Sequence, residues 1–299
     1  ARATRLGARI FGVNHRNLHD LTIDLTRSAR LATLAPEGAA VVAESGIRDA
    51  DTVRQLGAHA DGFLVGSQLT GQPDVDLAAR ELVYGPNKVC GLTSWSAAQA
   101  AKAAGAVYGG LIFEEASPRN VSRETSADII AHEPGLKYVA VSRRTSGCGD
   151  LIQPGIAAVQ VHAPYQGSIE AELDLVGRVR EEVRAADSTD APVEVWRAVS
   201  MTAGDGGAIA SEVLRGVDKL VLDAHAGGSG ETFEWDNIPD EVKPHALLAG
   251  GLSPANLPDA LSVGCAGVDL NSGVDYPAGA GTWAGRKDAA ALRRAFNII

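Results

Sequence analysis

The chain has 299 residues and contains 34 glycines, and 45% of its residues are hydrophobic. This length exceeds the usual size of one domain, so we expect one large domain or two unequal ones. The formal charge of −10 argues against nucleic acids and anionic membranes as partners, because both select basic surfaces.

The cysteines and the apolar runs indicate the cellular compartment of the protein and whether it crosses a membrane. Cys90, Cys148 and Cys265 are odd in number and widely spaced, which fits neither a disulfide framework nor a zinc pattern. We therefore expect a reducing, cytoplasmic location. No run approaches the roughly 18 apolar residues of a membrane span, and no signal peptide is recognisable. The sequence starts without such a leader at Ala1, and whether one was lost stays open.

The chain alternates throughout between β-branched runs and alanine-rich helical runs, which indicates parallel α/β architecture. In the first 86 residues the pattern predicts three strand–helix units, which are too few to close a barrel. The strands are Ala8–Asn14, Ala39–Ser45 and Gly62–Gly66, and the helices are Asp24–Leu34, Asp49–Leu56 and Val75–Tyr84. Gly85-Pro86-Asn87 is the strongest boundary signal in the chain.

Eight further strands follow this boundary within about 210 residues, which predicts a complete (β/α)₈ barrel over residues 87–299. They are Lys88–Cys90, Val107–Phe113, Lys137–Val141, Ala157–His162, Val193–Val199, Lys219–Asp223, Ala246–Gly250 and Gly267–Asn271. Helices are predicted at Ala97–Ala104, Glu124–His132 and Ile169–Ala185. Ser94 or Ser96 can cap the first of these helices and Ser122 the second.

The active site of such a barrel forms at the C-terminal ends of its strands. Cys90 ends the first strand, and Asp223 ends the apolar sixth strand. A lone buried cysteine is more often a small hydrophobic residue than a reactive thiol, and Asp223 can equally cap its loop. Together across the barrel mouth, however, they offer a general base opposite a general acid.

Other strand ends suggest contacts with a phosphorylated, carboxylate-bearing small molecule. Arg119 can bind a carboxylate, or it can be a solvated loop residue. His162 is either a ligand contact or a satisfied core histidine. Three glycine-rich turns can bring backbone amides close to a phosphate: Gly227-Gly228-Ser229-Gly230, Gly250-Gly251, and Asn271-Ser272-Gly273. No His, Cys or Asp cluster has metal-ligand spacing.

Several of these segments resemble phosphoribosylanthranilate isomerase, and they come in that family's order. They include Lys88-Val89-Cys90-Gly91-Leu92-Thr93, Ser117-Pro118-Arg119, Gln160-Val161-His162, Leu222-Asp223 and Asp269-Leu270-Asn271-Ser272-Gly273-Val274. The resemblance implies an Amadori rearrangement of N-(5′-phosphoribosyl)anthranilate that needs no cofactor. It makes Cys90 the general base, Asp223 the general acid and Arg119 the contact of the anthranilate carboxylate.

Residues 1–86 resemble the last three units of indole-3-glycerol-phosphate synthase. The resemblance rests on Gly12–Leu18, Glu44-Ser45-Gly46-Ile47 and Gly62–Ser67. It implies that Asn14, Glu44 and Ser45 belong to the synthase site and that Gly66 and Ser67 lie at its phosphate. That synthase also relies on two lysines and a glutamate from earlier strands, yet Lys88 is the first lysine here.

Three departures from the isomerase pattern put loop contacts in question: Ala163-Pro164 after His162, Asn120 after Arg119, and a Gly/Ala-rich insertion over Asp275–Lys287 that carries Trp283.

We expect an isomerase that carries a partial synthase barrel. The alternatives are the C-terminal portion of an intact bifunctional enzyme, and a phosphate-binding or assembly subunit that has lost catalysis. We expect the three-strand segment to self-associate or to be completed by a second fragment, because its edges offer unpaired backbone groups.

Overall fold

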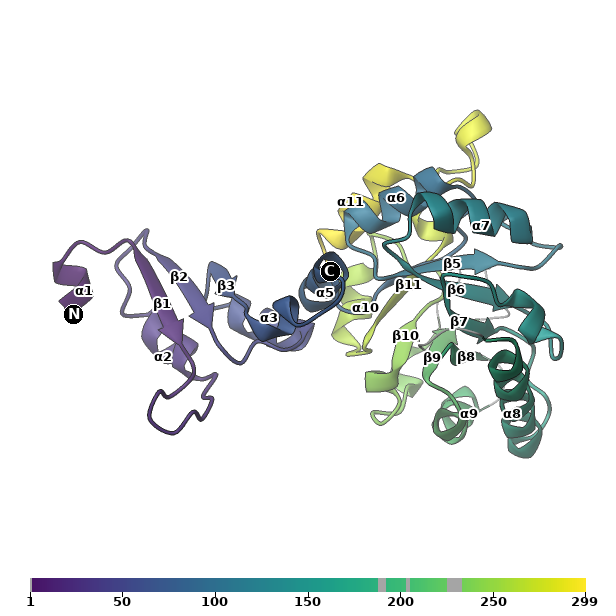
Figure 1. Cartoon of the computed structure of the whole chain (residues 1–299), viewed down its shortest axis with the longest axis horizontal. Coiled ribbons are helices and arrows are strands. Elements are labelled where there is room, and N and C mark those ends of the chain that lie inside the picture. Colours follow the sequence, from purple (N-terminus) through teal and green to yellow (C-terminus); the bar gives the residue numbers. More distant parts are fainter. Residues whose placement is uncertain (1, 188–191, 203–204, 225–232) are drawn as a thin grey trace. The chain divides into compact units, whose positions relative to one another are not determined.

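The computed structural model describes residues 2–187, 192–202, 205–224 and 233–299 (Figure 1). The chain divides into two compact units, Ala1–Gly85 and Pro86–Ile299. Each unit is described by itself below.

The first unit is built on a parallel three-stranded sheet in the order β1-β2-β3, which confirms the three predicted strand–helix units. The strands are β1 (Ile10–Asn14), β2 (Ala40–Glu44) and β3 (Gly62–Leu64). The helices are α1 (Arg2–Arg5), α2 (Arg27–Ala32), α3 (Ala50–Gly57), α4 (Ser67–Thr70) and α5 (Val75–Tyr84). The strands and α2 are shorter than their hydrophobic patterns predicted.

The core of this unit lies between the sheet and the helices α3 and α5, where Ala43, Ile47, Leu56 and Leu82 are buried together. Apolar side chains elsewhere in the unit stay open to solvent. Ile10 on one edge strand is 70% exposed and Leu64 on the other is 61% exposed. A sheet that exposes its edge strands in this way offers backbone groups for pairing.

The second unit is a closed barrel of eight parallel strands in the order β10-β11-β4-β5-β6-β7-β8-β9, as the sequence predicted. The strands are β4 (Lys88–Val89), β5 (Tyr108–Ile112), β6 (Lys137–Ser142), β7 (Ile156–Val161), β8 (Glu194–Ser200), β9 (Lys219–Asp223), β10 (Ala246–Leu248) and β11 (Gly267–Leu270). The first and last strands, β4 and β11, pair side by side and close the barrel.

Helices cover the outside of the barrel (Figure 1). They are α6 (Trp95–Ala104), α7 (Arg123–His132), α8 (Ile169–Ala186), α9 (Gly206–Val213), α10 (Leu257–Ser262) and α11 (Ala289–Phe296). Short 3₁₀ turns join them: η1 (Cys148–Leu151), η2 (Leu214–Gly216), η3 (Trp235–Asn237), η4 (Lys243–His245), η5 (Ser272–Val274) and η6 (Gly281–Trp283). None of the helices within the described ranges is long and apolar enough to cross a membrane.

Local sequence signals explain where these helices begin. The side chains of Ser94 and Ser122 accept hydrogen bonds from the backbone N–H groups of Ala97 and Thr125, so each serine caps its helix. Ser94, rather than Ser96, is therefore the cap of α6. Gly105 ends that helix with a φ of 128°, a conformation that favours glycine.

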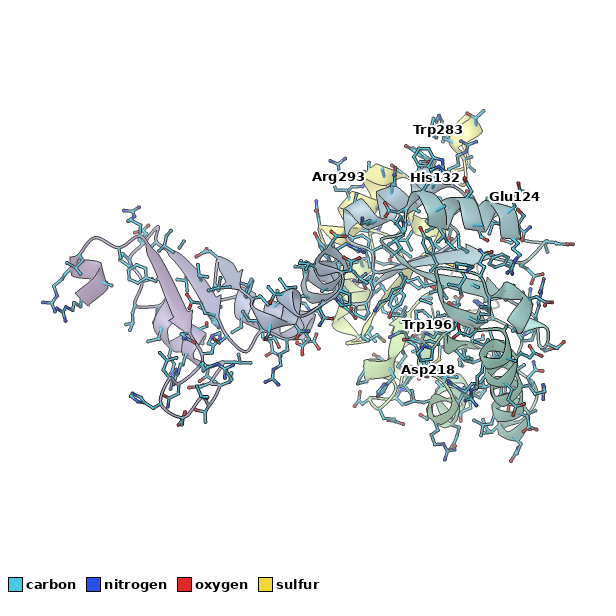
Figure 2. All side chains as sticks on the ribbon, in the orientation of Figure 1. Glu124, His132, Trp196, Asp218, Trp283 and Arg293 are labelled. Atoms are coloured by element: carbon cyan, nitrogen blue, oxygen red, sulfur yellow. The ribbon has the colours of Figure 1, made fainter. Side chains whose placement is uncertain are left out.

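Aromatic side chains fill the barrel at the N-terminal ends of the strands. Trp196 of β8, labelled in Figure 2, meets the edge of the Tyr108 ring with 4.8 Å between ring centroids. The ammonium groups of Lys137 and Lys219 lie 5.7 and 5.5 Å from the Tyr108 and Trp196 rings. This packing fills one end of the barrel and leaves the C-terminal strand ends as the place for a cavity.

Candidate active site

A cavity of about 310 Å³ lies at the C-terminal ends of the barrel strands. The structure brings most of the predicted isomerase residues to its wall: Cys90, Arg119, His162, Asp223, Gly250, Gly251, Asn271 and Ser272. Gly273 is not part of that wall, and Gly228 and Gly230 lie outside the described residues. The cavity thus collects a thiol, a carboxyl group, an imidazole and a guanidinium from strands far apart in sequence.

Cys90 follows β4 directly and lies at the edge of the cavity. Its backbone N–H donates to the carbonyl of Leu270 at 2.8 Å, so the sheet pairing extends one residue beyond the strand. Gly91 then turns the chain with a φ of 72°. A Cβ at Gly110 of the neighbouring strand would lie 2.7 Å from the Cys90 sulfur, so the glycine leaves the space that the thiol occupies.

Two buried charges lie beside the thiol. Lys88 Nζ donates to Asp269 Oδ2 at 2.6 Å, and Lys88 is fully buried. Burial is the largest single influence on Lys88 and disfavours the ammonium form, but the charges and hydrogen bonds of Asp269 and Cys90 together outweigh it and raise the pKa of Lys88. Burial raises the pKa of the Cys90 thiol, while the charges of Lys88 and Lys287 act in the opposite direction. The thiol is therefore the resting form, next to groups that favour its thiolate.

Asp223, the last residue of β9, faces the same cavity and is 6% exposed. Its Oδ1 accepts a hydrogen bond from the backbone N–H of Ala224 at 2.7 Å, which is the loop-capping contact that a structural role would require. Its Oδ2 lies 3.7 Å from Nε2 of His162. One carboxylate oxygen thus fixes the side chain, and the other lies toward the histidine at the cavity wall.

Arg119 is held in place by a partner that sequence reasoning missed. Its Nε and Nη2 donate to Oδ2 of Asp275 at 3.0 and 2.7 Å. Lys287 Nζ donates to the other oxygen of Asp275 at 2.7 Å and to the carbonyl of Asn271 at 3.0 Å. The reading of Arg119 as a solvated loop residue is wrong, because its side chain is only 15% exposed and forms an ion pair.

The ends of β10 and β11 carry glycines that the local backbone requires. Gly250 and Gly251 have φ values of 85° and 62°, and a Cβ at Gly250 would lie 2.9 Å from the backbone nitrogen of Ala224. A Cβ at Gly273 would lie 2.0 Å from the carbonyl oxygen of Leu252. These glycines let the two loops and the end of β9 approach one another closely at the cavity.

The candidate synthase residues gather at the C-terminal edge of the first unit's sheet. Asn14 and Glu44 end β1 and β2 and are register partners, and Ser45 follows with a φ of 69°. Gly66 and Ser67 come just after β3 and begin the short helix α4. The sheet therefore brings these five residues to one edge.

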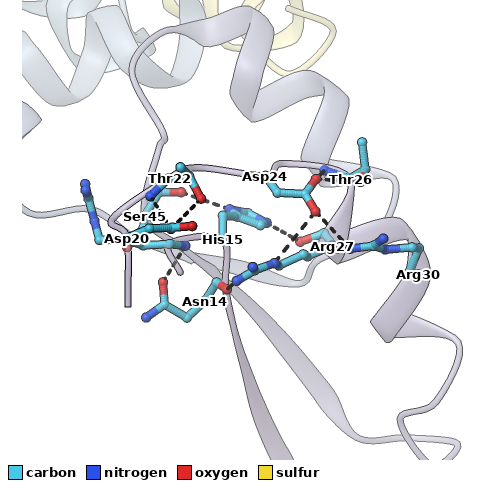
Figure 3. A network of polar contacts seen from close by, with 11 residues as sticks. Asn14, His15, Asp20, Thr22, Asp24, Thr26, Arg27, Arg30 and Ser45 are labelled. Carbon is cyan, nitrogen blue, oxygen red and sulfur yellow. Dashed lines mark hydrogen bonds and ion pairs between the residues drawn. The ribbon is translucent and has the colours of Figure 1, made fainter. Parts of the chain in front are cut away.

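His15 is a further residue of this edge, to which we had assigned no role. It is fully buried, with Nδ1 2.9 Å from the carbonyl of Ser45 and Nε2 2.7 Å from the hydroxyl of Ser28 (Figure 3). Since the carbonyl only accepts, a neutral His15 carries its proton on Nδ1 and Ser28 donates to Nε2. His15 thus holds the strained turn at Ser45 against α2.

No cluster of His, Cys, Asp or Glu that could hold a metal ion occurs among the residues that the structure describes. The groups that converge on the barrel cavity are instead a potential base, a potential acid and cations. Their placement at the C-terminal strand ends defines the class of the protein, a (β/α)₈-barrel enzyme whose candidate active site lies at that end of the barrel.

Comparison with known families makes this class specific. Residues 87–296 match the family described as N-(5'phosphoribosyl)anthranilate (PRA) isomerase, and residues 1–82 match indole-3-glycerol phosphate synthase. The chain belongs to the PRA isomerase family through its barrel, and it carries part of a synthase domain ahead of it.

Relatives and solved structures agree with this assignment. The chain is 67% identical over 299 residues to the "Tryptophan biosynthesis protein TrpCF" of Corynebacterium glutamicum and 38% identical to that of Salmonella typhi. It is covered completely in both matches and spans 62% of each relative's length. The phosphoribosyl anthranilate isomerase of Thermus thermophilus superposes with a TM-score of 0.54 and 25% identity, covering 71% of this chain and 96% of that one. TrpF from Jonesia denitrificans gives 0.52 and 29%, with coverages of 71% and 95%.

The space around the thiol can be tested by filling it. In Gly110→Ala the new methyl group would meet the Cα of Cys90 at 2.9 Å as well as its sulfur, so the strand must shift. We expect this change to lower the free energy of unfolding by about 1–3 kcal/mol, as overpacking does. Urea unfolding followed by circular dichroism measures it.

Gly177→Ala is the matched control, because Gly177 lies inside α8 with open space where its Cβ would be. We expect that variant to be as stable as the parent or about 0.4–1 kcal/mol more stable. Equal stability of Gly110→Ala and the parent would contradict the described packing.

Proposed function

We propose that the barrel catalyses the Amadori rearrangement of N-(5′-phosphoribosyl)anthranilate to the carboxyphenylamino-deoxyribulose phosphate. The observation that carries the proposal is that Cys90 and Asp223 face one cavity whose wall also includes Arg119, the Gly250-Gly251 turn and Ser272. The relatives are named as tryptophan biosynthesis proteins, and the proposal extends that role and a cytoplasmic location to this chain.

In this proposal, Asp223 donates its proton to the furanose ring oxygen, and the bond from that oxygen to C1′ breaks. The nitrogen lone pair forms an iminium ion at C1′, which acidifies the proton on C2′. The Cys90 thiolate, which forms when the resting thiol gives its proton to solvent, removes the C2′ proton, and the electron pair neutralises the iminium as an enolamine. The enolamine then tautomerises to the ketone, and proton exchange through water returns the thiol proton to the carboxylate.

Binding contacts in this proposal follow from the charges of the cavity. The guanidinium of Arg119 takes the anthranilate carboxylate, and Asp275 holds that guanidinium in place through Nε and Nη2. Gly250, Gly251, Ser272 and Gly273 bring backbone amides to the phosphate at the ends of β10 and β11. His162, 3.7 Å from Asp223, contacts the sugar beside the acid.

Replacing Cys90 by serine tests the base. The hydroxyl keeps the size of the thiol but ionises far above neutral pH, and a general base contributes about 10²–10⁴-fold. We expect kcat to fall by about that factor with a small change in KM, measured by the loss of substrate fluorescence. Cys265→Ser, outside the cavity, should leave turnover unchanged. Near-full activity of Cys90→Ser would rule out the assignment.

Asp223→Asn tests the acid, because it keeps the shape of the side chain and removes the transferable proton. We expect turnover to be lost while a reduced, non-reacting analogue of the product still binds, as calorimetry would measure. The exposed Asp259→Asn is the control and should keep both properties. If binding, turnover and the circular dichroism spectrum of Asp223→Asn all collapse together, Asp223 is structural.

A second candidate function is synthesis of indole-3-glycerol phosphate, favoured by the match of residues 1–82 to the synthase family. The residues proposed for it are Asn14, Glu44 and Ser45, with Gly66 and Ser67 at the phosphate. Because residues 1–87 contain no lysine, these side chains need lysines from other strands.

We expect the 299-residue chain alone to form no indole-3-glycerol phosphate. Mixing it with a fragment that holds the remaining length of its relatives should produce the activity, because the edge strands β1 and β3 can pair with added strands. In that mixture Glu44→Gln should lose the activity, whereas the exposed Glu37→Gln should keep it. Formation of indole-3-glycerol phosphate by the chain alone would contradict the hypothesis that the added fragment is required.

A further inference from the structure

Lys88 is a buried cation that the proposed reaction does not use. It stands two residues before Cys90, which continues the pairing of β4 by one residue, so both side chains point to the same side of the sheet. Lysine is almost never fully buried unless its charge is paired, and Lys88 has no exposed surface. Its place in the chain therefore calls for a reason beyond packing.

The contacts of Lys88 connect it to both the barrel seam and the thiol. Its ammonium donates to Asp269 Oδ2 at 2.6 Å, while Asp269 Oδ1 is buried without a hydrogen-bond partner. Cys90 is the other group whose charge acts on Lys88, and Lys88 is the strongest charge acting on Cys90. The ammonium group therefore pairs with the Asp269 carboxylate and also favours the thiolate form of Cys90.

Other charged groups surround the thiol from several elements. Asp269 of β11 opposes a thiolate, and Lys287, which is held by Asp275, favours it. Arg119 packs against Gly91 but is neutralised by Asp275. Farther around the same cavity stand His162, Asp223, Glu114 and Arg143. Burial lowers the pKa of Lys287, whereas the pKa of Lys88 is raised by its anionic neighbours, and Lys88 is the cation with the larger effect on Cys90.

We propose that Lys88 is a positioning residue whose buried ammonium group stabilises the Cys90 thiolate, with Asp269 holding that ammonium against the thiol. The inference rests on the proposed role of Cys90 as base. A thiolate inside an apolar barrel loses the hydration that it has in water, so a fixed cation supplies the stabilisation that solvent cannot. Asp269 keeps Lys88 charged while opposing the thiolate, so the two residues act on Cys90 with opposite sign.

Because Lys88 and Asp269 act on Cys90 with opposite sign, replacing each should shift the pKa of the thiol in opposite directions. A pair with a purely structural role would produce no such opposite shifts. The full chain would carry Cys148→Ala and Cys265→Ala, so that Cys90 is its one cysteine. Alkylation of Cys90 by iodoacetamide, followed by mass spectrometry across pH, gives the midpoint at which the thiolate forms. We expect Lys88→Met to move this midpoint up by at least about one pH unit, which means about tenfold slower alkylation at any pH below it.

Asp269→Asn should move the same midpoint down, because it removes the anion that opposes the thiolate, and the thiolate then becomes the anion that pairs with the ammonium of Lys88. Lys102→Met on α6, which deletes a lysine of another ion pair outside the cavity, should leave the midpoint unchanged. Midpoints that move in the same direction in both variants, or that stay in place, overturn the proposal. If Lys88→Met fails to fold, Lys88→Gln decides in its place, because it keeps a hydrogen-bond donor for Asp269 and removes the charge: a midpoint that rises supports the proposal, and any other result overturns it.

The readout is independent of the proposed reaction. Full turnover by Cys90→Ser would remove Cys90 as base without changing the alkylation profile of the parent. Unshifted midpoints would remove Lys88 from its role while leaving Cys90 as base. The failure of one hypothesis is therefore distinguishable from the failure of the other.

Discussion

The ion pair between Lys88 and Asp269 joins the first and last strands of the barrel, where the sheet closes. These residues are register partners on β4 and β11, a seam with only two paired positions. Removing one partner of a buried pair costs about 3–5 kcal/mol, yet replacing both by apolar groups is often neutral or stabilising. Stability alone therefore does not account for the pair. The pair lies two residues from Cys90, so the closure of the barrel is next to the residue that we propose as the base.

Part of the cavity wall is held by the segment that follows this seam in the chain. The hairpin that runs from Asp275 to Lys287 begins just after β11, and its two ends pair as an antiparallel bridge. Through Asp275 it holds Arg119, and through Lys287 it holds the loop at Asn271. Asp223 stands on β9, two strands away from β11 in the barrel order. Cys90 and Asp223 thus derive their positions from the pairing of the barrel strands, and Arg119 derives its position from the ion pair with Asp275.

The sequence was sufficient for the architecture because hydrophobic alternation and turn residues are local signals. Apolar runs that end in Cys90 and Asp223 place those side chains at the barrel mouth once eight units are counted. The pairing of Lys88 with Asp269 joins residues 181 positions apart, and local patterns carry no such information. The contact of Arg119 with Asp275 was missed for the same reason, since the insertion read only as a departure from the family.

The central claim is that the barrel acts on N-(5′-phosphoribosyl)anthranilate through a thiol base and a carboxylic acid. The most direct test is the fluorescence of that substrate during incubation with the purified 299-residue chain. The account predicts enzyme-dependent loss of fluorescence, with formation of the carboxyphenylamino-deoxyribulose phosphate confirmed by mass spectrometry of a reduced sample. Fluorescence that decays no faster than in buffer, with a folded chain verified by circular dichroism, would contradict it.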